Sequence, residues 1–381
     1  MKNVGVISMG IKAPIIREGD DLSKIVVNAV LDTTFIETKY ENVEDLGTKS
    51  GTKTEKNNIY DINDGDIIGI TESVVARSVG NYVTIDEIAN ELKNKFREAD
   101  NYTLVNPIYS RNRFSMILKA IARAAKESVI IYMPDADEVG NPSGVNQFTG
   151  VNMKDYYIEL VEGEGKKCVI HEGEWMNIFN RMSKDVTIYC GLHDYNQWKS
   201  DYGDNIHITL ADICSDKCEY GLLGSNKANE EKLKLFPSKK SAQTLVENIQ
   251  KEMLKKTNKT VQVMIYGDGC FKDPVGGIWE FADPEVSPAY TSGLAGRPNE
   301  IKIKAFADGK YANLSGTELE LAIKAEIKSK SNNLVGNMDS QGTTPRRYID
   351  LLGSLMDLTS GSGDRGTPII LVENYFKNYS N

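Results

Sequence analysis

Short runs of apolar and β-branched residues, each closed by turn residues, are a regular feature of this chain. The run at residues 261–266, VQVMIY, is followed by Gly267, so it predicts a buried strand that stops in a turn. Comparable runs predict strands at residues 3–9, 67–71, 104–107, 129–133, 301–306 and 369–373. Apolar positions at helical spacing predict helices that begin near residues 22, 85, 111, 241, 315 and 347. The polar stretch 38–58 predicts a loop.

The middle of the chain has a different pattern. Three strand-like runs alternate there with two helical stretches; the runs lie at residues 168–171, 186–190 and 206–209, and the helical stretches at 175–182 and 195–201. Strands that alternate with helices form parallel sheets, so a small parallel βαβαβ subdomain is predicted here. No Gly-x-Gly-x-x-Gly fingerprint accompanies it, which argues against dinucleotide binding.

The composition is that of an ordinary globular protein and narrows the possible functions. With 381 residues the chain is long enough for about two or three domains. The formal net charge of −9 argues against a general nucleic-acid-binding protein, whose surface is normally basic. No apolar run approaches the length that crosses a bilayer, and residues 1–16 lack the apolar core of a signal peptide. We therefore expect a cytoplasmic protein with neither nucleic acid nor membrane as a partner.

The cysteines and histidines do not predict a metal site or a nucleophilic centre. The five cysteines are scattered, and reduced thiols are the default in a chain without an export signal. The spacing Cys214-x-x-x-Cys218 with His207 upstream lacks the second pair that would complete a tetrahedral zinc site. The sequence also shows no obvious Ser-His or Cys-His pair.

Carboxylates, in contrast, follow two of the predicted strands. Asp268 comes directly after the strand at residues 261–266, and Asp135 and Asp137 follow the strand at residues 129–133. Ligands of open α/β sheets gather at the carboxyl ends of strands, and hard divalent cations prefer carboxylate oxygen. Two acidic turns of this kind are what a shared divalent-metal site needs, although aspartate is also an ordinary turn residue.

Two further segments favour anion binding. Arg111 and Arg113 fall in the first turn of a predicted helix, where a cation opposes the helix dipole unless an anion docks beside it. The alternative is a pair of solvent-facing arginines. Residues 361–368, GSGDRGTP, precede the last predicted strand, and their backbone N–H groups suit an anion-binding nest or, alternatively, a flexible loop. The glycine-rich segment 221–227 lacks the Gly-Lys-Ser/Thr ending of a P-loop.

Several of these segments resemble the γ-glutamyl ligases of deazaflavin coenzyme biosynthesis, the coenzyme F420-0:L-glutamate ligases. The resemblance lies in residues 10–16 with 19–22, in residues 64–80, in Asp268 after its strand, and in residues 361–368 with the following strand.

This resemblance implies a fold and a division of the chain. The expected fold class is α/β (mixed α+β), with an F420-ligase-like core and the small parallel βαβαβ subdomain inserted into it. The core is expected at residues 1–150 and 258–381, and the insert at residues 151–257, which the resemblance leaves unmatched. A homodimer is also implied.

The resemblance implies an activity as well. In that family a guanine nucleoside triphosphate and a divalent metal, Mg²⁺ or Mn²⁺, activate a substrate carboxylate as an acyl phosphate, and the amine of L-glutamate attacks it. For this chain we expect GTP or ATP as the co-substrate. The residues implied to lie along the nucleotide are Gly10, Ile11, Lys12, Ala13, Glu72, Ser73, Arg77, Asn141, Gly361, Ser362, Gly363, Asp364, Arg365, Gly366, Thr367 and Pro368. The residues expected at the metal are Asp268, Gly269, Asp137 and Asp135, and those expected to act in catalysis are Asp268, Asp137 and Arg111.

The chain departs from the family pattern at several of these positions. Glu72-Ser73 stands where the family has Gln-Lys, and Arg77 stands where it has a second lysine. Gly269 replaces a threonine, and Ser362 replaces a glutamine. These changes affect the choice of nucleotide and acceptor more than the class of reaction. Two other functions stay open: a metal-dependent phosphotransferase or hydrolase on the same scaffold, and a non-catalytic nucleotide- or metabolite-binding protein.

Overall fold

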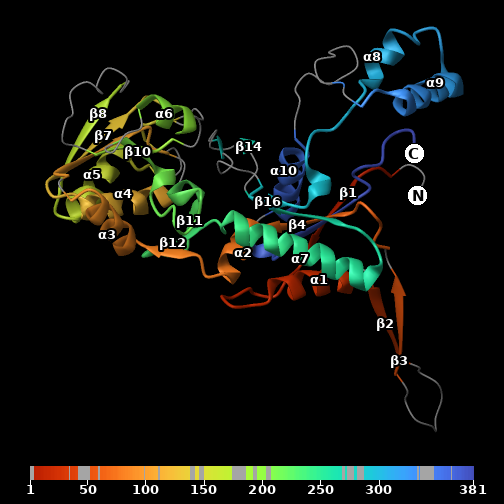
Figure 1. Ribbon diagram of the computed structural model, residues 1–381, viewed down its shortest axis with the longest axis horizontal. Coiled ribbons are helices and arrows are strands. Elements are labelled where there is room, and N and C mark those ends of the chain that lie inside the picture. The colour runs from red at the N-terminus through yellow and green to blue at the C-terminus, as the bar shows by residue number, and fades with distance from the viewer. Residues whose placement is uncertain are drawn as a thin grey trace.

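In the computed structural model the chain forms two units, each built around its own five-stranded sheet, with a three-stranded sheet between them (Figure 1). The structure describes residues 4–33, 35–41, 52–58, 61–97, 99–109, 112–137, 142–145, 150–173, 186–191, 195–202, 207–267, 271–272, 279–280, 287–332, 334, 347–361 and 363–381. At residues 35–41, 52–58, 271–272 and 279–280 it describes the backbone.

The first unit is built on a sheet with the strand order β1-β17-β4-β13-β16. Its strands are β1 (Ile7–Ile11), β4 (Ile67–Thr71), β13 (Gln262–Tyr266), β16 (Ala289–Tyr290) and β17 (Ile369–Glu373). β4 and β13 run parallel, whereas β17 lies antiparallel between β1 and β4. β1 and β4 therefore run in the same direction, although the last strand of the chain separates them.

Alternating apolar side chains in these strands bury both faces of the first sheet. On one face, Ile68 belongs to a core shared with α1 (Leu22–Thr33) and α7 (Lys239–Thr257). The preceding residue, Ile67, belongs to a second core on the other face, which α10 (Tyr348–Ser360) covers. The sheet is thus the middle layer of three.

The second unit is built on a sheet with the order β10-β9-β6-β7-β8, in which every neighbouring pair is parallel. Its strands are β6 (Asn101–Val105), β7 (Ser128–Met133), β8 (Lys167–Glu172), β9 (Val186–Tyr189) and β10 (His207–Thr209). The first of these strands in the chain, β6, is central, and the later strands extend the sheet first to one side and then to the other. This is the order of a doubly wound sheet.

Helices share the apolar core of the second unit. α3 (Ile85–Lys95), α4 (Asn112–Ala124) and α5 (Met153–Gly163) bury their apolar side chains with Leu104 of β6. The neighbouring Val105 belongs to a separate small cluster with Trp198 of α6 (Tyr195–Tyr202), so α6 packs on the opposite face.

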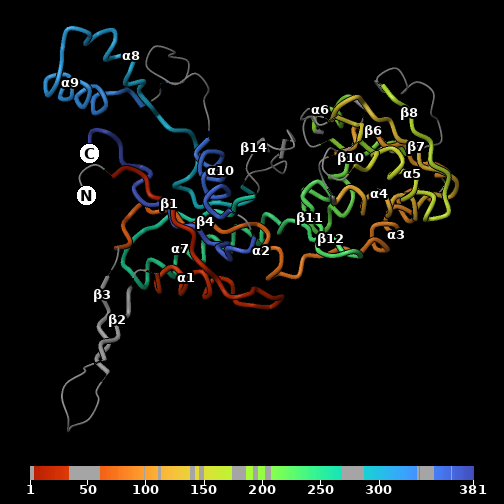
Figure 2. Tube along the Cα trace, turned by 180° about the vertical axis from the view of Figure 1, so that it is seen from behind, coloured from red at the N-terminus to blue at the C-terminus, as the bar shows by residue number. Residues whose placement is uncertain are grey.

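A three-stranded sheet joins the units where the chain leaves the first one and returns to it. β5 (Tyr82–Thr84) follows α2 (Glu72–Ser78) on the outward path, and β11 (Ser225–Lys227) and β12 (Lys232–Leu235) lie on the return path. β12 pairs antiparallel with both β5 and β11. Seen from behind in Figure 2, β11 and β12 lie between α2 and the second unit. The outward and the returning segments of the chain are therefore hydrogen-bonded to each other.

Several elements lie outside the main sheets; they are β2 (Phe35–Glu41), β3 (Thr52–Asn58), β14 (Phe271–Lys272), β15 (Trp279–Glu280), α8 (Ile303–Asp308), α9 (Gly316–Ser329) and short 3₁₀ turns. β2 pairs with β3, and β14 pairs with β15, each as an antiparallel pair. None of the helices in the described part of the chain is long and apolar enough to cross a membrane.

The predicted fold class, α/β with a mixed core and a parallel subdomain, is confirmed, but two local predictions are wrong. Residues 35–41 and 52–58 pair as antiparallel strands, although the sequence predicts a loop at residues 38–58, because these strands are polar and carry no apolar alternation. Residues 303–308 form a helix where a strand is predicted. Ile301 and Ile303 alternate with lysines, which favours a strand, whereas Ile303 and Phe306 lie three positions apart, which is a helical spacing.

The strand pairing also differs from the boundaries expected for the inserted segment, residues 151–257. β6 and β7 precede that segment, yet they pair with β9 and β8 in the parallel sheet. A parallel sheet needs both faces covered, so its strands belong to one folding unit. α7 lies within the segment, yet it buries Val246 and Ile249 against the first sheet. We therefore place the second unit at residues 85–224, between β5 and β11.

Candidate functional site

One edge of the first sheet collects segments from both ends of the chain. β1, β4 and β13 all end at this edge, and the antiparallel β17 begins there. Ile369, the first residue of β17, lies opposite both Ile11 and Ile70. Tyr266, the last residue of β13, lies opposite Thr71. The loops that follow or precede these strands are consequently neighbours.

The loop after β1 and the loop before β17 contact each other through their backbones. The N–H of Ala13 donates to the carbonyl of Gly366 at 3.1 Å. A Cβ added at Gly10 would lie 3.1 Å from the Cβ of Thr367, so glycine permits this close approach. Lys12 and Arg365 are exposed on the same two loops. The structure thus brings together two segments that the sequence assigned to one nucleotide site.

α2 begins at the same edge. The N–H of Thr71 donates to the carbonyl of Pro368 at 3.1 Å, which fixes the end of β4 beside the loop before β17. Glu72 is the first residue of the helix and is 2% exposed. A carboxylate there is favoured by the helix dipole. Arg77 lies in the last turn of the same short helix and is exposed.

Glu72 and Ser73 are held by residues of the connecting sheet. The side-chain amide of Asn226 donates to Glu72 Oε1 at 3.0 Å. The ammonium group of Lys234 contacts the hydroxyl of Ser73. No pattern in the sequence marks Asn226 or Lys234, because both contacts join the helix α2 to strands that lie more than a hundred positions later in the chain.

The aspartate expected at the metal follows β13 in the chain. β13 ends beside Thr71, and the next residue, Gly267, is buried at the edge. Asp268 and Gly269 follow it but lie outside the described residues, as do Arg111, Asn141 and Ser362. Their expected roles stay predictions.

Asp135 and Asp137 lie at the end of β7, in the second unit. Asp137 accepts a hydrogen bond from the N–H of Tyr109 at 3.3 Å, and the hydroxyl of Tyr109 donates to the carbonyl of Pro134 at 2.9 Å. Burial raises the pKa of Tyr109, and the charges of Asp137 and Asp135 raise this pKa further. Within the described residues, no three potential metal-binding side chains cluster. A metal shared by Asp137 and Asp268 therefore stays a prediction.

The second arginine of the predicted anion site has a different environment from the one expected. Arg113 in α4 is 3% exposed, so it is not a solvent-facing side chain. Its guanidinium donates to the backbone carbonyl of Ser225 in β11. Arg113 therefore joins the second unit to the connecting sheet.

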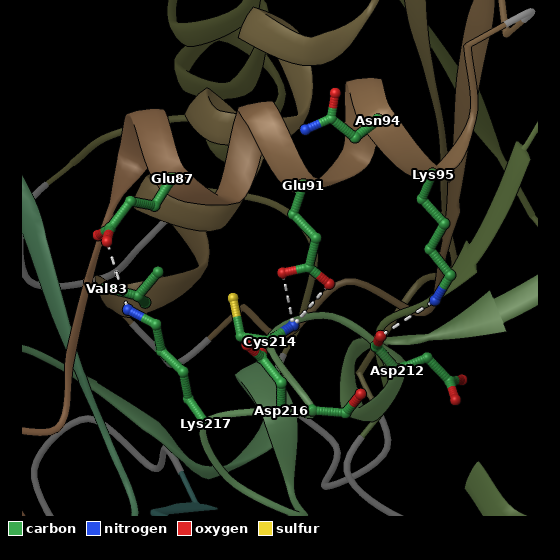
Figure 3. Close-up of a pocket in the computed structure, with 10 residues that line it drawn as sticks. Val83, Glu87, Glu91, Asn94, Lys95, Asp212, Cys214, Asp216 and Lys217 are labelled. Atoms are coloured by element: carbon green, nitrogen blue, oxygen red, sulfur yellow. Dashed lines mark hydrogen bonds and ion pairs between the residues drawn. The ribbon is translucent and has the colours of Figure 1, made fainter.

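A polar groove of about 620 Å³ lies between α3 and residues 212–217 (Figure 3). Both carboxylate oxygens of Glu91 accept the N–H of Cys214 at 3.0 Å, and the ammonium of Lys95 donates to the carbonyl of Asp212 at 3.3 Å. Burial, and secondarily the charge of Glu91, raises the pKa of the Cys214 thiol, so the thiol stays protonated. None of the predicted site residues lines this groove.

The fold and the edge described above define an α/β protein with a candidate phosphate-binding site at strand ends. Residues 10–374 match the protein family described as F420-0:Gamma-glutamyl ligase, and the chain belongs to this family. The matched range spans both units and nearly the whole chain. The family implies a ligase reaction. No curated protein matches the chain significantly.

Proposed function

We propose that the chain is a nucleotide- and divalent-metal-dependent ligase that forms an amide bond, specifically a γ-glutamyl bond. Family membership supports the ligase reaction. The observation that carries the finer proposal is the convergence of residues 10–13, residues 366–368 and the start of α2 at one sheet edge. Ligands of α/β sheets bind at strand ends of this kind.

The two loops suit the phosphates of GTP or ATP. Gly10 leaves space for a close backbone approach, and Gly366 has a φ of +65° that an L-residue rarely adopts. Backbone N–H groups in such loops bind anions. Lys12 and Arg365 are exposed cations on these loops, so they would neutralise phosphate charge.

Carboxylate oxygens would hold the metal. Asp268, Asp135 and Asp137 supply the hard donors that Mg²⁺ and Mn²⁺ prefer, and Gly269 would add a backbone carbonyl. When bound, the metal would neutralise the negative charge of the transferring phosphoryl group.

The proposed reaction has two steps and forms no covalent intermediate with the enzyme. An oxygen of the substrate carboxylate attacks the γ-phosphorus, the bond to the leaving diphosphate breaks, and an acyl phosphate forms. The amine of L-glutamate then attacks the acyl carbon, releases its proton, and expels inorganic phosphate. The new amide is a γ-glutamyl bond when the activated group is the γ-carboxylate of a glutamyl residue on the acceptor. The protein binds and orients these groups, with Lys12 and Arg365 along the phosphates and Arg111 beside the carboxylate.

The experiment is an incubation of the purified chain with coenzyme F420-0, L-glutamate, Mg²⁺ or Mn²⁺, and either GTP or ATP. Mass spectrometry is expected to show a nucleoside diphosphate together with a product heavier by one glutamyl group. Nucleotide hydrolysis without the adduct would support a phosphotransferase or hydrolase instead. Tight nucleotide binding without turnover would support a binding protein and contradict the proposal.

The proposal includes a homodimer in the cytoplasm, with no nucleic acid or membrane partner. Light scattering coupled to size-exclusion chromatography tests the dimer, since a monomeric mass at micromolar concentration would contradict it. Fractionation of the producing cells tests the location.

A further inference from the structure

We infer that Arg113 is a positioning residue, which acts from the second unit to fix β11 and, through β11, the start of α2. Because α2 begins at the sheet edge described above, this inference rests on the proposed function. By this inference the second unit contributes to the reaction, because it positions α2.

The first contact joins α4 to the connecting sheet. Arg113 is 3% exposed, and its guanidinium donates to the carbonyl of Ser225. Ser225 is fully buried, and its hydroxyl donates to the carbonyl of Leu222 at 2.6 Å. The first residue of β11 is therefore held by α4 through its carbonyl and by the preceding turn through its hydroxyl.

The next residue of β11 carries the contact to α2. The amide of Asn226 donates to the carboxylate of Glu72 at 3.0 Å, and Glu72 is 2% exposed. Thr71, which precedes Glu72 in the chain, donates its N–H to the carbonyl of Pro368 in the loop before β17. An uninterrupted series of neighbouring contacts thus runs from Arg113 to the sheet edge.

Stability alone does not explain a buried arginine at this point. Removing a guanidinium from water is costly, and an apolar side chain of similar volume often packs as well or better. The planar guanidinium offers donors in fixed directions, so it fixes the position of a carbonyl more closely than a flexible side chain does. Its effect is therefore expected in the placement of β11 and α2.

A small displacement of α2 would be costly for the proposed reaction. A misplacement of about 1 Å that is caused by a mutation far from the reacting atoms costs up to about 100-fold in catalytic efficiency. We expect Arg113→Met to lower kcat/KM for the nucleotide about 10-fold to 100-fold, chiefly through KM, because the loops beside Thr71 hold the phosphates.

The chain offers a matched control on the same helix. Arg123 of α4 donates to both carboxylate oxygens of Glu164 at 2.9 Å and to Asp86 at 2.7 Å, and all three residues belong to the second unit. Arg123→Met removes a guanidinium from α4 without touching β11. Arg113→Lys retains a charged donor and is expected to restore part of the lost kcat/KM.

The experiment compares the full-length wild type with Arg113→Met, Arg113→Lys and Arg123→Met. Hydrogen–deuterium exchange of peptides that cover α2 and β11 is measured alongside nucleotide KM and kcat. Arg113→Met is expected to speed exchange at α2 and raise KM, whereas Arg123→Met changes neither. If Arg113→Met fails to fold, hydrogen–deuterium exchange at α2 and nucleotide KM are measured for Arg113→Lys instead.

Two results would overturn the inference. One is unchanged exchange at α2 and unchanged KM in the Arg113 variants, and the other is an equal change in Arg123→Met. If the wild type neither binds nor turns over nucleotide, the proposed function fails, and the exchange at α2 still decides whether Arg113 positions that helix.

Discussion

Gly221 is the first residue of a 3₁₀ turn (Gly221–Gly224) that leads into β11, at the point where the chain returns from the second unit. Its φ is +51°, and an added Cβ would lie 2.5 Å from the carbonyl oxygens of both Ala211 and Ile213. Because these oxygens belong to the backbone, they cannot move aside by a side-chain rotation. We predict that Gly221→Ala destabilises the protein strongly.

The magnitude follows from two contributions. Alanine at a positive φ costs about 1 kcal/mol. Relieving the overlap also weakens the bonds from the N–H of Gly221 to Cys218 at 2.8 Å and from the N–H of Leu222 to Ile213 at 3.1 Å. At about 1 kcal/mol for each bond, the total loss is about 3 kcal/mol.

Gly316 is a matched control, because its φ is +53° but an added Cβ would meet no atom within 4 Å. Gly316→Ala is expected to cost only the backbone contribution of about 1 kcal/mol. Urea unfolding followed by circular dichroism measures both variants. With a slope of about 2 kcal/mol per molar urea, the midpoint falls by about 1.5 M for Gly221→Ala and about 0.5 M for Gly316→Ala. Equal shifts would refute the reasoning from backbone overlap.

Further predictions concern the metal, a buried acid and a helix cap. Asp268→Asn is expected to abolish metal-dependent turnover without unfolding the protein, whereas the exposed control Asp308→Asn keeps activity; a kinetic assay and a melting curve decide this. Burial raises the pKa of Glu373 above its ordinary 4.5, so the stability it contributes is present below that pH and is lost as pH rises through the raised value. Glu373→Gln should therefore raise Tm more at pH 7 than at pH 4, and an equal change at both would contradict the burial effect. Thr84 caps α3 by accepting the N–H of Glu87 at 3.1 Å while the Glu87 carboxylate accepts the N–H of Thr84 at 2.6 Å. Thr84→Ala is expected to cost about 1 kcal/mol in urea unfolding, with Thr84→Ser as the control that retains the cap.

Several strands of the first sheet were predictable from the sequence. The run at residues 261–266 is β13, and residues 67–71 and 369–373 are β4 and β17. Their apolar alternation or dense apolar composition is local, so it is readable without knowing the neighbours. The pairing of β2 with β3 was not predictable, because these polar strands carry no such signal.

The contacts at the candidate site, in contrast, were not predictable from local patterns in the sequence. The motifs at residues 10–13 and 361–368 are visible in the sequence only as separate loops, and their backbone contact exists because β17 lies between β1 and β4. Asn226, Lys234 and Arg113 were not identified as a group, since each meets its partner across strands or helices that are far apart in the chain.

By itself the sequence determined the class of fold, the strands of the second sheet, the strands β1, β4, β13 and β17 of the first, and the segments that carry polar and glycine-rich turns. It did not predict α2 or the three-stranded connecting sheet. The features that it determined depend on periodicity and turn chemistry within a few residues. Only the tertiary structure decided the strand order, which assigns β6 and β7 to the parallel sheet and α7 to the first unit. It also decided which loops meet at one edge and which side chains of the second unit contact the first. The physical reason is that sheet pairing and burial are satisfied between distant segments, and a local pattern does not specify the partner.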